Sequence, residues 1–381
     1  MHDFIKNTWV MVVKMKAAII TRHAIANYGS LLQAFATEEI IRDIGVDPVI
    51  IDYVRTDERP ENATKLLLKK SSKWGKNILT KGIYFIVQHP DHVLMGRAFR
   101  KFQKEWLTLT PDTYASFDEL KNGRIMADIY CTGSDQVWGD IGTELYDPAY
   151  FLRFVPDNCK KISIAASMGY STIPENVVLD YKKAFDSYYS ITVREKNAEK
   201  LISGLTDVDV QQILDPTLLY KDTYWENKIE KSDYHDYVLL YQLNANPEMD
   251  RYAERFAKKC GKKLIRVSPE LHNCLRPGKF VYLPTPGKFL ALIKNADYMI
   301  TDSFHGTAFA INFNTQFVDF FPKKKSSRNK SILELTGLMD RVVTDYNDYG
   351  YIEKKIDFAP VNRIIADERK KSLDIIQNMF K

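Results

Sequence analysis

The stretch that decides the fold is "DYMITDSFHGTAFAINFNTQFVDFF", residues 297–321. It opens with an apolar run, "DYMIT", continues through a polar turn into an apolar helical segment, "AFAINF", and ends in a second apolar run, "TQFVDFF". Strands that are apolar on both faces and alternate with helices are typical of a parallel sheet covered by helices. This stretch therefore predicts a doubly wound α/β domain.

The same rhythm of strands and helices runs along the whole chain. It begins with "KAAIIT", "PVIIDY", "ADIYCTG", "KISIAAS" and "SITVRE", pauses in the charged stretch 221–236, and restarts with "YVLLYQL", "KKLIRVS" and "KFVYLP". A chain of 381 residues also exceeds the size at which single cores stop growing. We predict an N-terminal Rossmann-like domain over 15–220 with a basic and aromatic insertion at about 60–110, a C-terminal Rossmann-like domain over 235–345, and a C-terminal helix over 355–381 that packs on a domain face.

Composition excludes several classes of protein. The net charge of +5 is too mild and too dispersed for a nucleic-acid-binding protein. The four cysteines lie far apart without a CxxC pair, which indicates neither a zinc site nor a disulfide framework and fits reduced thiols in a cytosol. Lys14 and Lys16 interrupt the first apolar run, so we expect no export signal. Because "MKAAIITRH" at Met15 looks like a natural start, it stays open whether the residues before it are an extension. We expect a cytoplasmic protein.

The sharpest motif is "TDSFHGT", residues 301–307, which follows a strand and opens a helix. Ser303, Thr307 and the free backbone N–H groups of the first helical turn are expected to form an anion site, which Gly306 lets a ligand approach closely. His305 would point into this site as a general acid or base beside a bound phosphate. The alternative is a histidine that caps the helix or packs in the core.

Two further motifs follow strands. Arg194 in "SITVREKNA" ends a buried strand, where its guanidinium can grip a carboxylate or phosphate in two places; the alternative is an ion pair with Glu195 or Asp215. Asn27 and Gly29 in "NYGSLLQAFA" follow the first strand and start a helix. Gly29 suits a tight turn against a ligand, although the motif lacks the GxGxxG spacing of a dinucleotide site.

A loop suited to sugars follows the strand "ADIYCTG". Asp135, Gln136 and Trp138 combine two hydrogen-bonding side chains with an aromatic ring, and the alternative is a structural turn around a buried tryptophan. In "AASMGYS", Ser167 and Gly169 would bring backbone amides to the same cleft.

The remaining polar candidates are less specific. Asp215, before Pro216, suits a structural turn and an active-site carboxylate equally, and His23 lies in the loop after the first strand, from which it could reach the same cleft. HExxH, Walker A and GxSxG motifs and metal-spaced His/Cys clusters are absent from the sequence, so we expect no metal site.

Taken in order, "NYGSLLQAFA", "GSDQVW", "AASMG", "TVRE", "DPTLL" and "TDSFHGTAFA" resemble the polysaccharide pyruvyl transferase family, from about Ala17 to Phe321. The resemblance implies a fold similar to that of GT-B glycosyltransferases, with two Rossmann-like domains facing across a cleft and the donor bound by the C-terminal one. It implies phosphoenolpyruvate as donor, a hexose as acceptor and no cofactor. An arginine of the family's "VR" motif and a histidine of its "S-x-H-G" motif serve the donor, and they match Arg194 and His305 here.

The chemistry of this family explains the residue types. A pyruvate ketal forms when the methylene carbon of phosphoenolpyruvate is protonated, one sugar hydroxyl attacks the adjacent carbon, phosphate leaves and a second hydroxyl attacks. We expect Arg194 to clamp an anionic end of the donor, His305 to donate the proton or support the leaving phosphate, and Asp135 or Asp215 to accept the sugar proton. The full set of expected site residues is catalytic His305, Arg194 and Asp135, donor-binding Ser303, Gly306, Thr307, Asn27 and Gly29, and acceptor-binding Asp135, Gln136, Trp138 and Ser167.

Two basic stretches depart from the family core. The insertion between Lys65 and Leu109 suits contact with an anionic membrane that carries lipid-linked oligosaccharide acceptors, and the alternative is a solvated helical pair covering the first sheet. A position at the inner face of the cytoplasmic membrane therefore stays open. "PKKKSSRNK", Pro322 to Lys330, suits an acceptor diphosphate or a plain surface loop.

Two rival functions fit the same fold. The first is a GT-B glycosyltransferase that uses a nucleotide sugar, since two facing Rossmann-like domains serve both chemistries. The second is a non-catalytic sugar- or anion-binding accessory protein of polysaccharide assembly. The joint presence of Arg194 and His305 favours the transferase, which would act in capsular, exopolysaccharide or cell-wall polysaccharide biosynthesis.

Overall fold

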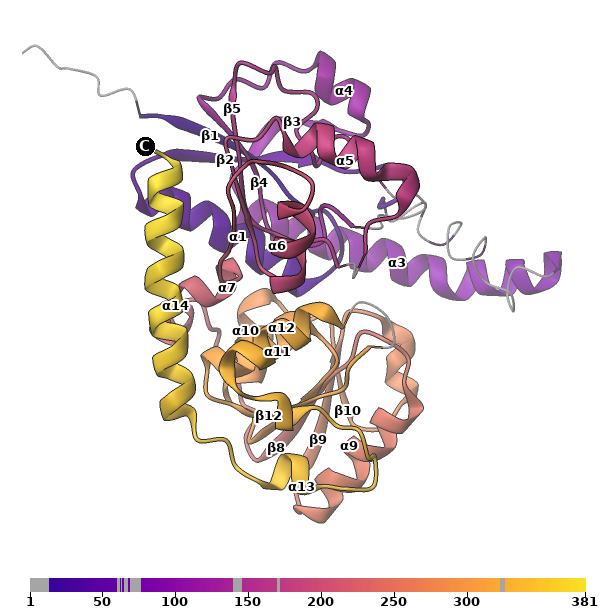
Figure 1. Ribbon diagram of the computed structural model, residues 1–381. Helices are drawn as coiled ribbons and strands as arrows, with labels where there is room; N and C mark the ends of the chain where they lie inside the picture. The colour runs from indigo at the N-terminus through magenta and orange to yellow at the C-terminus, as the bar shows by residue number, and fades with distance from the viewer. Residues whose placement is uncertain are drawn as a thin grey trace, which may run out of the picture.

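The predicted fold class is confirmed by the computed structural model, which holds two α/β domains, each built on a fully parallel sheet. In Figure 1 the N-terminal domain lies above the C-terminal one, and a long C-terminal helix runs along one side of both. The structure describes residues 14–59, 62, 64, 68, 77–139, 146–169, 172–322 and 326–381. The proposed extension before Met15 lies almost wholly outside these residues.

The N-terminal sheet has the strand order β3-β2-β1-β4-β5-β6-β7. Its strands are β1 (Lys16–Ile20), β2 (Asp47–Tyr53), β3 (Leu109–Tyr114), β4 (Ile129–Thr132), β5 (Lys160–Ala166), β6 (Ser190–Val193) and β7 (Val210–Gln212). The order reverses between β1 and β4, and ligands of open α/β sheets bind at the carboxyl ends of strands beside such a switch point. The loops after β1 and β4 open there.

The C-terminal sheet has the order β10-β9-β8-β11-β12. Its strands are β8 (Tyr237–Tyr241), β9 (Lys263–Ser268), β10 (Lys279–Tyr282), β11 (Tyr298–Thr301) and β12 (Gln316–Asp319). The order reverses between β8 and β11, so the loop that follows β11 and contains the "TDSFHGT" motif opens at this domain's switch point.

Helices cover both sheets, and several begin at a capping side chain. In the first half these are α1 (Tyr28–Asp43), α3 (Ile78–Trp106), α4 (Phe117–Asn122), η1 (Glu175–Val177), α5 (Val178–Phe185), α6 (Lys196–Ser203), α7 (Pro216–Leu219) and α8 (Asp222–Glu226). In the second half they are α9 (Pro247–Lys259), η2 (Leu271–Leu275), α10 (Pro286–Lys294), α11 (Phe304–Asn312), α12 (Ser327–Thr336), η3 (Met339–Arg341), α13 (Gly350–Glu353) and α14 (Phe358–Met379). Asn246 and Thr285 accept hydrogen bonds from the first turns of α9 and α10, each of which has proline at its first position.

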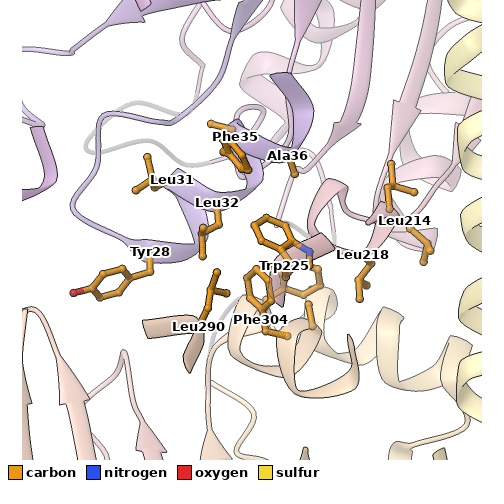
Figure 2. Packing of buried hydrophobic residues seen from close by; sticks show 14 of the residues in the cluster. Tyr28, Leu31, Leu32, Phe35, Ala36, Leu214, Leu218, Trp225, Leu290 and Phe304 are labelled. Atoms are coloured by element: carbon orange, nitrogen blue, oxygen red, sulfur yellow. The ribbon is translucent and has the colours of Figure 1, made fainter. Parts of the chain in front are cut away.

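One hydrophobic cluster joins the two domains. Figure 2 shows the residues of α1 facing Leu290 of α10 and Trp225 of α8, so α1 packs against both domains at once. Tyr28 of α1 stacks on Phe289 with ring centroids 4.4 Å apart, and its hydroxyl donates to the Pro284 carbonyl at 2.7 Å. This shared core fixes the position of one domain against the other.

The C-terminal helix α14 also ties the domains together. It leaves the C-terminal domain and returns to the N-terminal one, where Ser372 Oγ accepts from Leu214 N at 3.0 Å and Arg369 Nε donates to Leu218 O at 2.9 Å. The expected C-terminal helix thus contacts both domains instead of a single face.

The basic insertion is represented by α3, a 29-residue helix. Phe99 and Phe102 near its C-terminal end are buried, and Arg100 pairs with Asp52 of β2. Its N-terminal half extends away from the domain in Figure 1. The expected partner helix falls on a segment of which residues 65–67 and 69–76 lie outside the described residues. None of the described helices is both long enough and apolar enough to cross a membrane.

Trp225 tests the shared core. Its ring lies 6.1 Å from that of Phe35 on α1 and 5.1 Å from that of Phe309 on α11, and its side chain is fully buried. We expect Trp225→Ala to lower the free energy of unfolding by about 3–5 kcal/mol, because the cavity would open between the two domains. Urea denaturation measures the change. Leu179→Ala, at a side chain that is 81% exposed, is the control, and a loss no larger than the control's would contradict the shared core.

Candidate functional site

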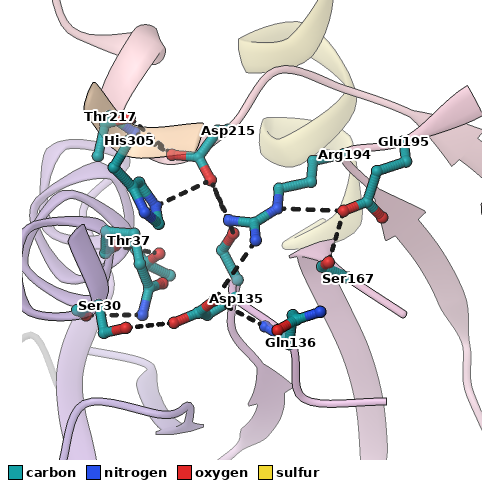
Figure 3. A network of polar contacts seen from close by, with 12 residues as sticks. Ser30, Thr37, Asp135, Gln136, Ser167, Arg194, Glu195, Asp215, Thr217 and His305 are labelled. Atoms are coloured by element: carbon teal, nitrogen blue, oxygen red, sulfur yellow. Dashed lines mark hydrogen bonds and ion pairs between the residues drawn. The ribbon is translucent and has the colours of Figure 1, made fainter. Parts of the chain in front are cut away.

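Four residues predicted separately meet at the boundary between the domains. Arg194 follows β6, Asp135 follows β4 and Asp215 precedes α7, all in the N-terminal domain. His305 comes from the first turn of α11 in the C-terminal domain. Figure 3 shows them as one polar network with Arg194 at its centre. The site therefore exists only where the two domains are in contact.

Arg194 is buried and surrounded by carboxylates. Its Nη1 donates to Asp215 Oδ2 at 2.7 Å and to Ser134 Oγ at 3.2 Å, whereas Nη2 to Asp135 and Nε to Glu195 are both 3.4 Å contacts. The alternative interpretation, an ion pair with Glu195 or Asp215, is present in the structure with both partners. The two 3.4 Å contacts lie beyond the usual range of a strong hydrogen bond, so those edges of the guanidinium are held more weakly.

Asp215 has the structural role that the sequence offered, and it also pairs with Arg194. Its Oδ1 caps α7 by accepting from Thr217 N at 3.0 Å and Thr217 Oγ1 at 2.7 Å, while Oδ2 binds Arg194. Burial favours the neutral acid, but His305 and Arg194 outweigh this effect and hold the pKa of Asp215 well below its usual range. The carboxylate beside His305 is therefore ionised at neutral pH.

His305 faces Asp215 at a distance that suits an ion pair but not a hydrogen bond. Its Nε2 lies 3.7 Å from Asp215 Oδ2, and it has no hydrogen-bond partner among the described residues although the side chain is only 5% exposed. A Cβ on Gly29 would lie 2.1 Å from His305 Nδ1. Gly29 thus makes room for this imidazole. We expected a ligand to approach Gly29 closely, but the group that does so is the His305 side chain of the protein itself. The ring of the neighbouring Phe304 lies beside the Arg194 guanidinium, with its centroid 4.5 Å from Cζ.

The other residues of the "TDSFHGT" motif serve the fold. Ser303 Oγ caps α11 by accepting from Gly306 N at 3.3 Å, and Thr307 Oγ1 donates to Asp319 Oδ2 at 2.7 Å. A Cβ on Gly306 would lie 2.6 Å from Thr301 Oγ1, so this glycine lets α11 pack closely on β11. These contacts occupy the groups of Ser303 and Thr307 that were expected to bind an anion.

Asp135 sits on strained backbone. Its φ is 75°, a left-handed conformation that costs free energy for a non-glycine residue and is concentrated at functional sites. Oδ1 accepts from Gln136 N at 2.8 Å, and Oδ2 accepts from the Ser30 hydroxyl. Burial opposes ionisation, but Arg194 leads the positive groups that hold the pKa of Asp135 well below its usual range. Ala165, at the end of neighbouring β5, is left-handed too, with a φ of 51°.

The structure does not present Trp138 to a sugar. The indole is fully buried, its Nε1 donates to Tyr150 O at 3.1 Å, and its ring centroid lies 4.9 Å from that of Phe185. The expected stacking surface is therefore enclosed by protein, and the structural alternative, a turn around a buried tryptophan, describes this loop.

The remaining acceptor candidates lie at the network's edge. Gln136 is half-buried, and its Nε2 has no hydrogen-bond partner among the described residues. Ser167 donates its hydroxyl to Glu195 Oε1, so its side chain is already engaged. A Cβ on Gly169 would lie 1.9 Å from Gln136 Nε2, so this glycine makes room for Gln136.

Two N-terminal candidates are structural. Asn27 caps α1 by accepting from Ser30 N at 3.2 Å. His23 does not reach the cleft as expected: it is fully buried, with Nε2 3.1 Å from Asp52 Oδ1 and Nδ1 3.2 Å from Thr21 O. A buried hydrogen-bonded pair satisfies this imidazole within the core.

Sequence reasoning missed three members of the network. Ser30 binds Asp135, and Glu195 was weighed only as a partner of Arg194. Burial raises the pKa of Glu195, and its Oε2 has no hydrogen-bond partner among the described residues. The third is Arg328, on the first turn of α12, whose charge acts on Asp135 and Glu195. Its sequence signal was only its place in the basic "PKKKSSRNK" stretch.

A small pocket adjoins the network between the domains. It is lined by Arg194, Asp215 and Gln212 from one domain and by Phe304 and Ser331 from the other. In the part of the chain that the structure describes, no group of three His, Cys, Asp or Glu side chains is placed to hold a metal ion. The network places the Arg194 guanidinium and the His305 imidazole beside the carboxylates of Asp135 and Asp215.

The chain matches a family model described as polysaccharide pyruvyl transferase over residues 27–321. All six motifs on which the resemblance depends lie in this span, so the predicted family is confirmed. No curated protein matches the chain.

Several solved structures are similar in fold. UDP-GlcNAc 2-epimerase from Neisseria meningitidis is 11% identical, with 96% of this chain and 99% of that chain covered at a TM-score of 0.48. UDP-GlcNAc 2-epimerase from Methanocaldococcus jannaschii is 12% identical, with 96% of this chain and 99% of that chain covered at a TM-score of 0.47. Spinosyn forosaminyltransferase is 10% identical, with 95% of this chain and 97% of that chain covered at a TM-score of 0.49. At sequence identities this low, the similarity to these structures says nothing about the substrate or the reaction of this chain.

Asp319 makes the stability of the C-terminal domain depend on pH. Its Oδ2 accepts from Thr307 and Asn329, its Oδ1 has no hydrogen-bond partner among the described residues, and burial raises its pKa to about 7. The unfolded carboxyl ionises near pH ~4, so the folded state binds more protons between these values. This contribution to stability is therefore present at low pH and is lost as the pH rises through about 7.

Asp319→Asn should remove the loss of stability that accompanies ionisation of Asp319 as the pH rises, because the amide stays neutral. We expect the stability of the variant relative to the parent protein to be greater at pH 8 than at pH 5, measured by urea denaturation. Asp112→Asn, at an exposed carboxylate, is the control. A variant whose stability changes with pH as the parent's does would show that Asp319 is ionised in the folded protein.

Proposed function

Since this chain belongs to the polysaccharide pyruvyl transferase family, we propose that it transfers the enolpyruvyl unit of phosphoenolpyruvate to a hexose and closes a pyruvate ketal across two hydroxyls. The observation that carries the proposal is the meeting of His305 with Arg194 and Asp215 at the domain boundary. An acid, a cation and a fixed carboxylate are the groups that this reaction needs.

Arg194 is proposed to hold one anionic end of the donor. Its 2.7 Å bond to Asp215 keeps the guanidinium in place, whereas the 3.4 Å contacts to Asp135 and Glu195 are the ones that a donor oxyanion would replace. A carboxylate or phosphate gains two charge-assisted hydrogen bonds from such an edge. Among the expected donor residues, Asn27, Ser303, Gly306 and Thr307 shape the site through the helices that they start, and Gly29 gives His305 its place.

His305 is proposed as the proton donor. Its Nε2 lies 3.7 Å from Asp215 Oδ2 and has no hydrogen-bond partner among the described residues, so this nitrogen is open to a bound donor. The proton would go to the methylene carbon, which makes the adjacent carbon electrophilic, or to the phosphate as it leaves. One sugar hydroxyl forms the first C–O bond, inorganic phosphate departs, and the second hydroxyl closes the ketal.

The acceptor is proposed to enter beside Asp135. This carboxylate would take the proton of the attacking hydroxyl, and the half-buried Gln136 would bind a neighbouring hydroxyl through its unpartnered Nε2. The acceptor is proposed to be a lipid-linked oligosaccharide of polysaccharide biosynthesis. The first half of α3 carries the exposed Leu79 and Ile86 near Lys81, a composition that suits peripheral contact with the cytoplasmic face of a membrane.

His305→Ala is expected to lower the rate of transfer by about 10²- to 10⁴-fold, because the general acid is lost. The assay is phosphate release from phosphoenolpyruvate in the presence of a panel of p-nitrophenyl hexosides. His235→Ala, at an exposed histidine in the linker, should leave the rate unchanged. An unaltered rate in the His305 variant would remove its assigned role, and turnover of a nucleotide sugar in place of phosphoenolpyruvate would replace the proposed reaction.

Transfer is also expected to continue in EDTA, because guanidinium groups supply the positive charge that the donor requires. The measurement is the same phosphate-release assay after dialysis against EDTA, with a Mg²⁺-dependent kinase as a positive control for chelation. Activity that vanishes in EDTA and returns with a divalent cation would contradict this expectation.

A further inference from the structure

The first turn of α12 is held between the two domains. Ser331 Oγ accepts from Lys196 N at 3.3 Å and from Gln212 Nε2 at 3.2 Å, and both of these residues belong to the N-terminal domain. Arg328 lies three residues before Ser331, and side chains three apart share a helix face. Arg328 is therefore directed toward the same part of the N-terminal domain, where Lys196 follows Arg194 and Glu195.

Asn329 fixes the same turn from the other side. Its side chain is 1% exposed and donates to Asp319 Oδ2 at 2.7 Å, the oxygen that also accepts from Thr307 of α11. The starts of α11 and α12 are thus bound to one carboxyl at the end of β12. His305 and Arg328 are carried on these two helix starts, which places both at the polar network.

Arg328 has charged neighbours but no bonded partner. Asp135, Glu195 and Asp215 attract its charge and Arg194 repels it; burial and this repulsion lower the pKa of its guanidinium. Yet Arg328 makes no hydrogen bond or ion pair with any residue that the structure describes, and its Nε is buried. A buried donor without a partner costs free energy, so such a group in a folded protein calls for an explanation. Arg194, by contrast, bonds through all three of its nitrogens.

We propose that Arg328 binds an oxyanion of the donor, its phosphate or its carboxylate, opposite Arg194. This inference rests on the proposed function and adds a second arginine, from the other domain, to the donor site. An anion between two guanidiniums is attracted by both and screens their mutual repulsion, and arginine's planar fork matches either oxyanion. The unpartnered Nε2 of His305 belongs to the same network, so the acid and both arginines would meet one bound donor.

Calorimetric titration tests this assignment with phosphoenolpyruvate, inorganic phosphate and pyruvate as separate probes. Arg328→Ala should raise the Kd of phosphoenolpyruvate by about ten- to hundredfold, and Arg328→Lys, which keeps the charge without the fork, by less. Lys330→Ala, at an exposed residue of the same helix, should leave it unchanged. Weakened binding of phosphate alone would assign Arg328 to the phosphate end, and weakened binding of pyruvate alone to the carboxylate end.

Thermal unfolding separates binding from a structural role. Arg328→Ala should unfold at or above the parental midpoint, since it loses no hydrogen bond, whereas Arg194→Ala should unfold well below it because it strands three carboxylates. Parental binding of phosphoenolpyruvate by Arg328→Ala, or a loss of stability as large as that of Arg194→Ala, would overturn the role of Arg328 and leave the proposed function intact. No binding of phosphoenolpyruvate by the parent protein would overturn the proposed function, and this assignment with it.

Discussion

The ion pair between Arg194 and Asp215 is the interaction on which the site depends. Both groups are buried, and removing a charge from water costs several kcal/mol even after the surroundings relax. The cost is offset only if other groups complete the coordination, which here come from the ends of β4 and β6 and from the cap of α7. Three loops must therefore converge on Arg194, and in one of them Asp135 has a left-handed backbone.

The second constraint is that His305, the proposed acid, comes from the other domain. His305 reaches the network because α11 and α1 approach closely at Gly29, and that approach depends on the apolar core shared by α1, α8 and α10. Separating the domains would expose this core to water, which opposes a large opening motion. Packing between the domains thus sets the 3.7 Å distance between His305 Nε2 and Asp215 Oδ2.

The fold could be predicted because its strands are buried on both faces, so each appears as a continuous apolar run followed by the loop that carries function. The same reasoning located Arg194, Asp135, Asp215 and His305, each of which directly follows a strand or opens a helix. It did not show what each residue contacts. A glycine such as Gly29 indicates a close approach without identifying the approaching group. Trp138 was misjudged because the polar residues before it say nothing about the aromatic rings that enclose it.

Arg328 was not predicted for a related reason. Its neighbouring lysines make the segment look like a solvated surface loop, and only the tertiary structure brings Arg328 to the network. Its inclusion changes the charge balance of the site. Asp135 and Asp215 are ionised, while burial shifts Glu195 toward its neutral form, so the two guanidiniums nearly balance the carboxylates before any ligand binds. A donor with two anionic groups then brings an excess of negative charge into a buried site. The guanidiniums of Arg194 and Arg328, one from each domain, would meet that excess together, so the proposed donor site depends on the packing between the domains.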